Sequence, residues 1–325
     1  CMGPTVVIAY EGFGDILLEQ DVLSAVNANV VHTKSLDTPE AIESIKQADA
    51  LMVTIQKVPA DLIATMARCR VISRAGTGLD AIAIAAATAR GIWVAYVPDY
   101  SIDEVSTHAL ALLLAHARRL PRLIESTRQG LWDYQVVPPI ERFNTQSVGV
   151  LGFGRIGRAF ALKAKGIGLD VMAYDPNIPA AVIEAAGVRG VDFETLLRTS
   201  DYISLHMPLL DSTRNFIDAR ALALMKPTAF LINAARGGLV DEGALLTAVR
   251  AGQIAGAALD VLVGEPPPPN YPLLHEERIW ITPHVGWYSE AARRDVRIRA
   301  AEEVVRVWRG ETPRCPANQV DGANA

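Results

Sequence analysis

Three side chains in the second half of the chain could together reduce a carbonyl group that lies next to a carboxylate. Arg236 offers a planar guanidinium that could bind the carboxylate and polarise the neighbouring carbonyl oxygen. His284 is a candidate acid and base, because an imidazole exchanges protons near neutral pH. Glu265 could accept a hydrogen bond from the far ring nitrogen and favour the imidazolium. The charged ring would then donate a proton to the carbonyl oxygen while a hydride arrives from a nicotinamide.

Each of these residues also has an ordinary structural interpretation. An arginine can cap the edge of a sheet, a glutamate can lie in a solvated loop, and a lone histidine is more often structural than catalytic. Their common position favours chemistry, because each lies at or beyond the end of a predicted strand. The carboxyl ends of parallel strands share one edge of a sheet, and ligands bind in the crevice at that edge.

A glycine motif upstream provides a place for the hydride donor. Gly152 allows a tight turn, Gly154 lets the backbone approach a pyrophosphate, and Gly157 lets the following helix pack closely on a strand. The amide groups of Arg155 and Ile156 would lie at the N-terminus of that helix. They would face the phosphates with the positive end of the helix dipole.

The elements around these glycines complete a βαβ unit. A strand is predicted at Val148–Leu151, a helix continues to about Lys165, and a second strand at Val171–Tyr174 leads to Asp175. A glycine motif alone is weak evidence, because an ordinary strand–helix corner also uses glycine, but the complete order favours a dinucleotide. The Asp175 carboxylate can accept both hydroxyl groups of an adenosine ribose and would repel a 2′-phosphate. The sequence therefore predicts NAD(H) rather than NADP(H) as the cofactor.

Before this unit, short apolar runs alternate with helical patterns. Such alternation with short connections predicts a parallel sheet covered on both faces, here without a nucleotide motif of its own. The predicted strands are Val6–Tyr10, Val30–Thr33, Ala50–Ile55, Val71–Arg74 and Ile92–Tyr96, and the predicted helices are Glu19–Val26, Pro39–Ala48, Pro59–Arg68 and Leu79–Arg90.

A second β/α series follows a long helix that should begin after Ser101, which has the side chain of an N-cap, and end near Arg118. A final helix at Ser289–Arg309 should return to the first domain and make it discontinuous. We therefore predict an α/β protein with two doubly wound parallel sheets. Residues 1–99 and 290–325 would form a flavodoxin-like substrate domain, and residues 100–289 a Rossmann-type NAD domain. The other strands expected in the second series are Tyr202–Leu205, Ala229–Asn233, Gly256–Leu259 and Ile279–Thr282, with helices at Phe193–Thr199, Ala219–Met225 and Glu242–Ala251.

Composition argues against several other classes of protein. The chain has 325 residues, a formal net charge of −5 and no basic run, which disfavours a nucleic-acid partner. No apolar stretch reaches the roughly 20 residues of a membrane helix, so no membrane association is expected. The three cysteines include no CxxC pair, and we expect a reducing, cytoplasmic location and no metal site.

The motifs resemble those of the D-isomer-specific 2-hydroxyacid dehydrogenase family, and the resemblance covers nearly the whole chain. It implies NAD-linked interconversion of a D-2-hydroxyacid and its 2-oxoacid, with Arg236, Glu265 and His284 as the catalytic residues. It also implies an active site between the domains and a homodimer joined through the NAD domains. The stretches that carry the resemblance are GTGLDAIAIAAATARGIWV at 76–94, VPDYSIDEVSTHALALLLA at 97–115, GFGRIGRAFALKAKG at 152–166, LHMPLLDSTRNFI at 205–217, INAARGGLVDEGAL at 232–245 and TPHVGWYSE at 282–290.

Further ligand contacts are implied by the same resemblance. Asp260 and the carbonyl of Ala234 would hold the nicotinamide carboxamide, and the loop amides of Thr77 and Gly78 would hold the substrate carboxylate. Tyr100 matches a position that contacts substrate in D-lactate-type members. The loop at 54–57 reads Thr-Ile-Gln-Lys where phosphoglycerate-specific members usually carry an Arg-Ser pair, which disfavours phosphoglycerate as the substrate.

Within the family, residues 237–242 and 284–290 look most like those of the C-terminal-binding proteins, which are transcriptional corepressors with this dehydrogenase fold. Trp287 would form a wall of the substrate pocket, or alternatively fill the gap beneath the hinge between the domains. The branch resemblance raises a second hypothesis, an NAD(H)-sensing interaction protein of the corepressor type. The complete acid/base set favours the enzyme, because it has no evident use in a scaffold.

Overall fold

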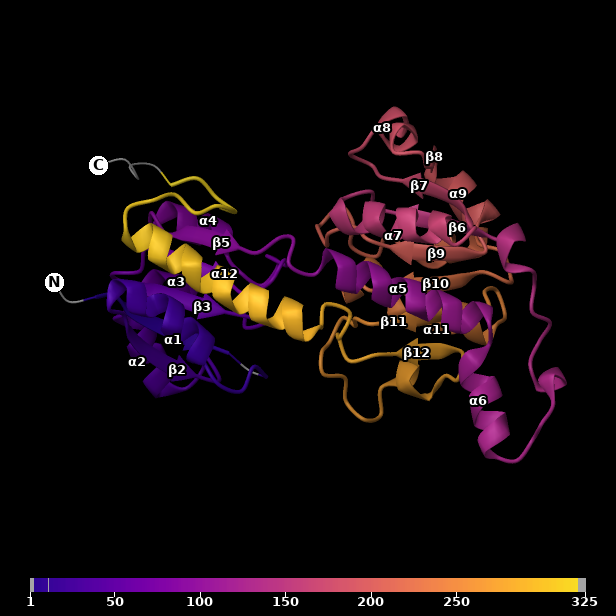
Figure 1. Cartoon of the computed structure of the whole chain (residues 1–325), viewed down its shortest axis with the longest axis horizontal. Helices are drawn as coiled ribbons and strands as arrows, with labels where there is room; N and C mark the ends of the chain where they lie inside the picture. The colour runs from indigo at the N-terminus through magenta and orange to yellow at the C-terminus, as the bar shows by residue number, and fades with distance from the viewer. Residues whose placement is uncertain (1–2, 11, 321–325) are drawn as a thin grey trace. The chain divides into compact units, whose positions relative to one another are not determined.

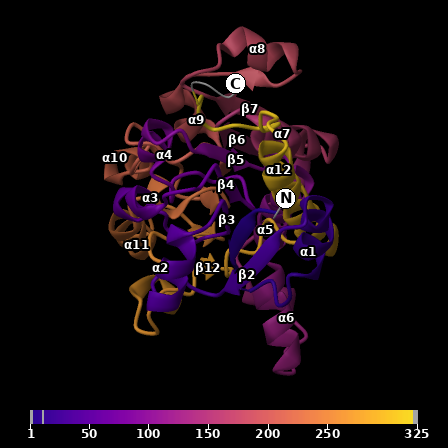
Figure 2. The ribbon, with the colours of Figure 1, turned by 90° about the vertical axis from the view of Figure 1, so that its left-hand side faces the viewer.

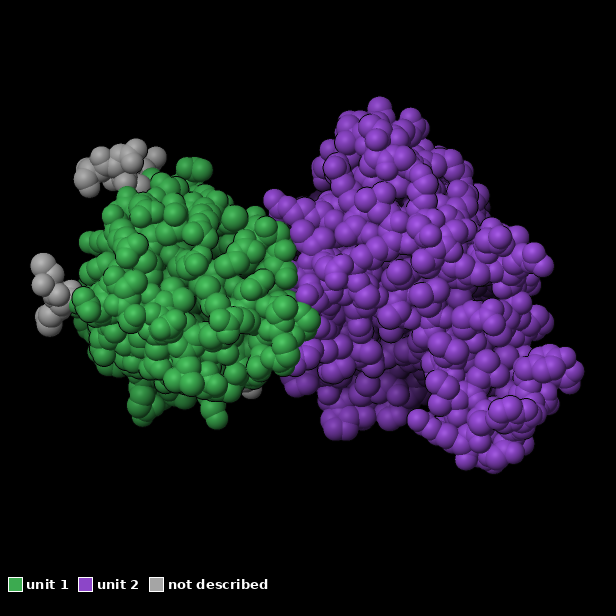
Figure 3. All heavy atoms as spheres, in the orientation of Figure 1, with its two compact units in different colours: residues 1–100, 289–325 green, residues 101–288 purple. Residues whose placement is uncertain are grey.

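The structure is a computed structural model that describes residues 3–10 and 12–320. The chain divides into two compact units (Figure 3). Unit 1 consists of Cys1–Tyr100 and Ser289–Ala325, and unit 2 of Ser101–Tyr288. Each unit is built on its own parallel sheet.

Unit 1 contains a five-stranded parallel sheet in the order β2-β1-β3-β4-β5. This is the strand order of flavodoxin-like folds, the type of fold that the sequence predicted for this domain. Four of its strands are mostly apolar and buried, as expected where helices cover both faces of a parallel sheet, whereas the edge strand β2 is only partly buried. The strands are β1 (Thr5–Ala9), β2 (Asn29–Thr33), β3 (Ala50–Val53), β4 (Val71–Arg74) and β5 (Trp93–Tyr96).

Helices cover the two faces of this sheet in separate groups (Figure 2). On one face α1 (Leu17–Leu23) and α12 (Glu290–Trp308) enclose a core with β1, β3 and β4. The other face is covered by α2 (Pro39–Lys46), α3 (Ala60–Thr65) and α4 (Ile84–Ala89). A short 3₁₀ helix, η1 (Ser24–Val26), extends α1.

The C-terminal helix α12 is an integral part of unit 1. The Ser73 hydroxyl on β4 donates a hydrogen bond of 2.7 Å to the carbonyl of Ala300 in α12. Arg297 of α12 donates to both carboxylate oxygens of Glu19 in α1, at 2.6 and 2.7 Å, and both side chains are buried. The helix that the sequence predicted at 289–309 thus closes one face of the first sheet.

Unit 2 contains a seven-stranded parallel sheet in the order β12-β11-β10-β9-β6-β7-β8. The strand order reverses between β6 and β9, and ligands of doubly wound sheets bind at such a switch point. The predicted fold class, two doubly wound parallel sheets, is confirmed. The strands are β6 (Ser147–Leu151), β7 (Asp170–Tyr174), β8 (Arg189–Gly190), β9 (Tyr202–Leu205), β10 (Phe230–Asn233), β11 (Gly256–Leu259) and β12 (Ile279–Ile281).

Two long helices, α5 (Ile102–Ala117) and α7 (Arg155–Gly166), cover one face of this sheet (Figure 1). The other face packs against α9 (Phe193–Thr199), α10 (Ala219–Leu224) and α11 (Glu242–Arg250). The remaining elements of unit 2 are α6 (Leu120–Arg128), α8 (Ala180–Ala185) and the 3₁₀ helices η2 (Tyr134–Val136), η3 (Phe143–Thr145), η4 (Gly237–Leu239) and η5 (Pro272–His275).

One local prediction was wrong, and another was confirmed only in part. The helix expected at Leu79–Arg90 begins only at Ile84, because the backbone before it pairs with Val58. The Val58 amide donates to the Ala81 carbonyl, and the Val58 carbonyl accepts from the Ala83 amide. Ser101 occupies the N-cap position of α5, but its side chain makes no capping hydrogen bond. Tertiary pairing and local backbone geometry overrode side-chain preference at both places.

A buried histidine in α5 makes unit 2 sensitive to acid. The ring of His116 stacks on Phe230 with the ring centroids 3.6 Å apart, and Arg119 Nη1 lies 2.8 Å from His116 Nε2. Burial and then the charge of Arg119 lower the pKa of His116 to about 3. An unfolded chain binds this proton near pH 6.5, so this contribution to stability is present above about pH 6.5 and is lost as the pH falls towards the folded-state value.

Below about pH 6.5, we therefore expect His116 to lower the free energy of unfolding by about 1.4 kcal/mol for each unit by which the pH decreases. The total decrease between pH 7 and pH 5 should be about 2 kcal/mol. Urea unfolding of the wild type and of His116→Phe at the two pH values measures it. The phenyl ring keeps the stack, and the loss of the Arg119 contact affects both pH values alike. Equal losses in the two proteins would contradict the assignment.

Candidate active site

The glycine loop after β6 has the shape that a pyrophosphate requires. Gly152 adopts φ +93°, and a Cβ added there would lie 2.7 Å from the backbone of His206. A Cβ at Gly157 would lie 2.0 Å from the carbonyl oxygen of Gly152, which fixes how closely α7 approaches the turn. A Cβ at Gly154 would meet no atom within 4 Å, so space is open above the N-terminus of α7. The loop therefore fits a dinucleotide phosphate.

The helix begins where the sequence predicted. Arg155 and Ile156 form the first turn of α7, whose amide groups have no acceptors within the helix. That Arg155 and Ile156 contact a bound cofactor stays a prediction. The same is true of cofactor binding by Gly152, Gly154 and Gly157.

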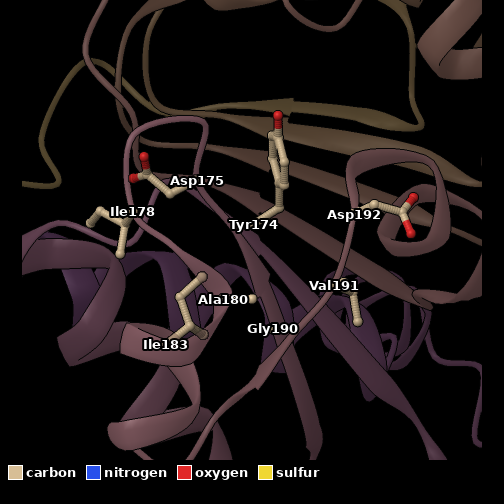
Figure 4. A pocket seen from close by; sticks show the side chains of 8 residues that line it. All are labelled: Tyr174, Asp175, Ile178, Ala180, Ile183, Gly190, Val191 and Asp192. Atoms are coloured by element: carbon tan, nitrogen blue, oxygen red, sulfur yellow. The ribbon is translucent and has the colours of Figure 1, made fainter.

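Asp175 follows β7 and is held by the loop that it faces. The amide of Phe153 donates to its Oδ2 and the amide of Asn177 to its Oδ1, both at 2.8 Å. It lies at one end of a pocket, with Asp192 at the other end and the side chains of Ile178 and Ile183 on one wall (Figure 4). The full lining is Tyr174, Asp175, Ile178, Ala180, Ile183, Gly190, Val191 and Asp192. An anchored carboxylate beside an apolar wall suits an adenosine.

Glu265 and His284 form a close pair at the end of the sheet where β11 and β12 terminate. His284 Nδ1 lies 2.6 Å from Glu265 Oε2, and the Leu262 amide donates to Glu265 Oε1 at 2.8 Å. Burial alone would raise the pKa of Glu265, but the hydrogen bonds from His284 and Leu262 outweigh it and lower that pKa. The carboxylate is therefore charged, and Nε2 is the ring nitrogen left to act on a substrate.

The turn that carries His284 is held by Asp260. The His284 amide donates to the carbonyl of Asp260 at 2.9 Å, while the amides of Val285 and Gly286 donate to its carboxylate at 2.9 and 2.8 Å. Thr282 Oγ1 donates to the same carboxylate at 2.5 Å. His284 adopts a left-handed φ of +51°, which costs a non-glycine residue on the order of 1 kcal/mol.

Asp260 is 2% exposed, so its first task is structural: it orients the turn that carries His284. Burial opposes ionisation of its carboxyl, but the hydrogen bonds from His108 and Thr282 and from the turn amides outweigh this and lower its pKa. The predicted contact of Asp260 and Ala234 with a nicotinamide carboxamide stays a prediction.

Arg236 follows β10 on the same edge. Its carbonyl accepts a hydrogen bond of 2.9 Å from the buried side chain of Asn233, and its Nη1 donates to the carbonyl of Ala235 at 2.6 Å. The next residue packs against the loop of Glu265, because a Cβ at Gly237 would lie 2.0 Å from the carbonyl carbon of Leu262. The Arg236 segment and the Glu265 loop are thus in direct contact.

The predicted substrate residues are divided between the units. Thr77, Gly78 and Tyr100 belong to unit 1, where the Thr77 hydroxyl donates to the carbonyl of Val97 at 3.3 Å. Trp287 belongs to unit 2 and contacts Tyr288 edge-on, with ring centroids 5.6 Å apart. The part of all four in substrate binding stays a prediction.

The sequence reasoning did not single out His108 and Thr282. His108 Nε2 in α5 lies 3.2 Å from Thr282 Oγ1 and 3.4 Å from Asp260 Oδ1, beneath the turn of His284. Thr282 is two residues before the predicted catalytic residue His284, and this proximity in the sequence could have indicated a role at the site. His108 stands in the middle of an apolar helix, where only the tertiary structure shows its contact.

Unit 2 is thus a doubly wound domain with a dinucleotide loop at its switch point and a histidine–glutamate pair on the same sheet edge. A sequence model described as "D-isomer specific 2-hydroxyacid dehydrogenase, NAD binding domain" matches residues 110–286. The chain therefore belongs to the D-isomer-specific 2-hydroxyacid dehydrogenase family, and its second unit carries the NAD-binding domain of that family.

Relatives and solved structures agree with this family. The chain is 42% identical over 278 residues to a D-3-phosphoglycerate dehydrogenase of Methanocaldococcus jannaschii, a match that covers 85% of this chain and 53% of that protein. It is 37% identical to one of Mycobacterium leprae, covering 90% of this chain and 56% of that protein. The chain spans about half the length of the curated relatives it matches.

A D-lactate dehydrogenase of Aquifex aeolicus, solved with NAD and lactic acid, superposes with a TM-score of 0.86 at 26% identity. That match covers 94% of this chain and 96% of the other. None of the helices in the described part of the chain combines the length and the apolar character that a membrane span requires. Residues 3–10 and 12–320 contain no group of three or more His, Cys, Asp or Glu side chains placed to bind a metal ion.

Proposed function

We propose that the protein catalyses the NAD(H)-linked interconversion of a D-2-hydroxyacid and the corresponding 2-oxoacid. The observation that carries the proposal is the 2.6 Å contact between Glu265 and His284, on the sheet edge that also bears Arg236 and the dinucleotide loop. Relatives named as phosphoglycerate and lactate dehydrogenases support the same class of reaction.

NAD(H), which the loop of Gly152, Gly154 and Gly157 would hold, would supply the hydride that reduces C2 of the acid. Arg236 binds the carboxylate and polarises the carbonyl oxygen. His284 donates the proton from Nε2 to that oxygen, and Glu265 holds the proton on Nδ1, so that hydride and proton together give the alcohol. The loop amides of Thr77 and Gly78, with Tyr100 and Trp287, complete the substrate contacts in this proposal.

The substrate is best sought among small 2-oxoacids with NADH at saturation. The panel contains glyoxylate, hydroxypyruvate, pyruvate, phenylpyruvate, branched 2-oxoacids and 3-phosphohydroxypyruvate. Oxidation of NADH with at least one acid, together with the D-hydroxyacid as product, is the expected result. NADH binding without turnover of any acid would contradict the proposed dehydrogenase activity and favour the hypothesis of an NAD(H)-sensing interaction protein.

The cofactor preference depends on Asp175. We expect turnover with NADH to exceed that with NADPH, and Asp175→Ala to narrow the ratio by about 10- to 100-fold, because like charges placed together cost several kcal/mol. Asp192→Asn is the matched control: it lies on the same pocket, and asparagine preserves the cap that Asp192 gives to α9. An unchanged ratio in Asp175→Ala would refute the ribose assignment.

We also propose that the protein is a homodimer joined through unit 2. The side chains on and after α6 are unusually apolar for a surface, and such patches mark contact sites. Four large apolar or aromatic side chains in this segment are exposed: Trp132 to 91%, Tyr134 to 79%, Leu131 to 51% and Ile124 to 48%. Light scattering should give a dimer for the wild type and for Leu17→Asp, an exposed position in unit 1, but a monomer for Trp132→Asp. A monomeric wild type would overturn the proposal.

A cytoplasmic location belongs to the same proposal. Cys69 and Cys315 are both free thiols, and Cys69 is buried, as suits a reducing compartment.

A further inference from the structure

The loop from 260 to 271 carries Glu265 between β11 and η5, and neighbouring elements fix it at two places. Near its start, two successive amides donate to two different glutamates: Leu262 to Glu265 at 2.8 Å, and Val263 to Oε1 of Glu242 at 2.9 Å. At its end, the hydroxyl of Tyr271 donates to Oε2 of Glu242. One carboxylate in the first turn of α11 therefore holds both ends of the loop.

The partners of Glu242 are suited to a fixed contact. Burial, followed by the hydrogen bond with Glu242, raises the pKa of Tyr271 to about 12, so its phenol remains a donor at every ordinary pH. The Tyr271 ring packs against the buried core of unit 2. Asp241 caps α11 by accepting from the amide of Ala244 at 2.9 Å, which sets the position of the Glu242 backbone.

The peptide that Glu242 holds lies between two parts of the candidate active site. A Cβ at Gly237 would lie 2.0 Å from the Leu262 carbonyl carbon and 2.4 Å from the Val263 nitrogen, so the two backbones touch. Arg236 immediately precedes this contact, and Glu265 follows Val263 two residues later on the loop. A movement of the 262–263 peptide would therefore displace the carboxylate of Glu265 relative to both Arg236 and His284.

We propose that Glu242, together with Tyr271, is a positioning residue that sets the Glu265 loop against the Arg236 segment and so orients His284. The inference rests on the proposed function. An acid at this place can also have a purely structural role, because a carboxylate in the first turn interacts favourably with the positive end of the helix dipole. That role would affect stability and leave the chemistry unchanged.

The test compares Glu242→Ala, Glu242→Gln and Tyr271→Phe with the control Glu194→Ala, which removes a first-turn acid from α9. Removing a residue that orients a functional side chain, such as the hydrogen-bond partner of a metal-bound histidine, typically lowers activity by about 10- to 100-fold. We therefore expect Glu242→Ala to lower kcat by that factor and to leave the Kd for NADH within about twofold of the wild type. Glutamine can still accept from Val263 and pair with the phenol, so Glu242→Gln should restore most of kcat.

The pH profile separates positioning from a purely structural role. Reduction needs the protonated imidazole, so activity should fall as the pH rises. With Glu265 displaced, this fall should occur at a lower pH in Glu242→Ala than in the wild type, because the carboxylate no longer favours the protonated ring. Glu194→Ala should keep the wild-type profile. A kcat within twofold of wild type and an unshifted profile in Glu242→Ala would overturn the inference while the proposed function stood.

Hydrogen exchange keeps the inference testable if the wild type reduces no acid, which would defeat the proposed function alone. We expect amides in 261–271 to exchange faster in Tyr271→Phe and Glu242→Ala, and those of α9 to remain unchanged. Equal exchange rates in these variants and in the wild type would show that Glu242 and Tyr271 do not hold the loop in place. Should Glu242→Ala fail to fold, Tyr271→Phe carries the kinetic and the exchange readouts, and Glu242→Gln serves as the variant expected to stay near the wild type.

Discussion

His284→Ala is expected to lower kcat for 2-oxoacid reduction by about 10²- to 10⁴-fold, the range that general acid catalysis supplies. The imidazole lies 2.6 Å from Glu265 through Nδ1, which leaves Nε2 to donate the proton to the substrate. Alanine removes the proton donor and leaves the dinucleotide loop, which lies at β6, untouched. The Kd for NADH should therefore stay close to that of the wild type.

Single-turnover kinetics with the acid identified in the panel measures this effect. Glu265→Gln should give a smaller loss, because glutamine can still accept from Nδ1 but no longer stabilises a positive ring. His32→Ala, an exposed histidine on β2, is the matched control and should behave as the wild type. If His284→Ala retained full activity, the proton would have to come from another group and the proposed mechanism would fail.

Arg236→Ala should produce the second large effect, on kcat/KM. Truncating one partner of a desolvated charge pair costs about 2–5 kcal/mol, which corresponds to about 30- to 5,000-fold in kcat/KM. We expect KM for the acid to rise and kcat to fall together, because the guanidinium both binds the carboxylate and polarises the carbonyl. Steady-state kinetics at saturating NADH measures both terms.

The chemistry of the guanidinium can be tested apart from its charge. Arg236→Lys keeps the charge but loses the bidentate geometry, so it should recover little of the loss. Arg220→Ala, an exposed arginine on α10, is the control for removal of a positive charge from the same unit. Recovery of most activity in Arg236→Lys would show that a point charge suffices and would contradict the bidentate assignment.

Many strands could be predicted from the sequence, because a parallel strand that is buried on both faces consists of a short run of apolar residues. The strands at Val71–Arg74, Tyr202–Leu205 and Gly256–Leu259 begin and end where they were predicted. The short elements α8 (Ala180–Ala185) and β8 (Arg189–Gly190) were not foreseen. Too few residues carry their pattern, and their contacts with unit 2 stabilise them.

The sequence by itself determined the residue types of the site, because a dinucleotide loop needs glycines at fixed spacing and those glycines are visible as letters. It also indicated that Arg236, Glu265 and His284 follow strands of one sheet. Only the tertiary structure decided which of their atoms meet. The 2.6 Å pair of Glu265 and His284, and the support from Asp260, join segments separated along the chain. No local pattern encodes such contacts, since they arise when loops after different strands converge on one edge of the sheet.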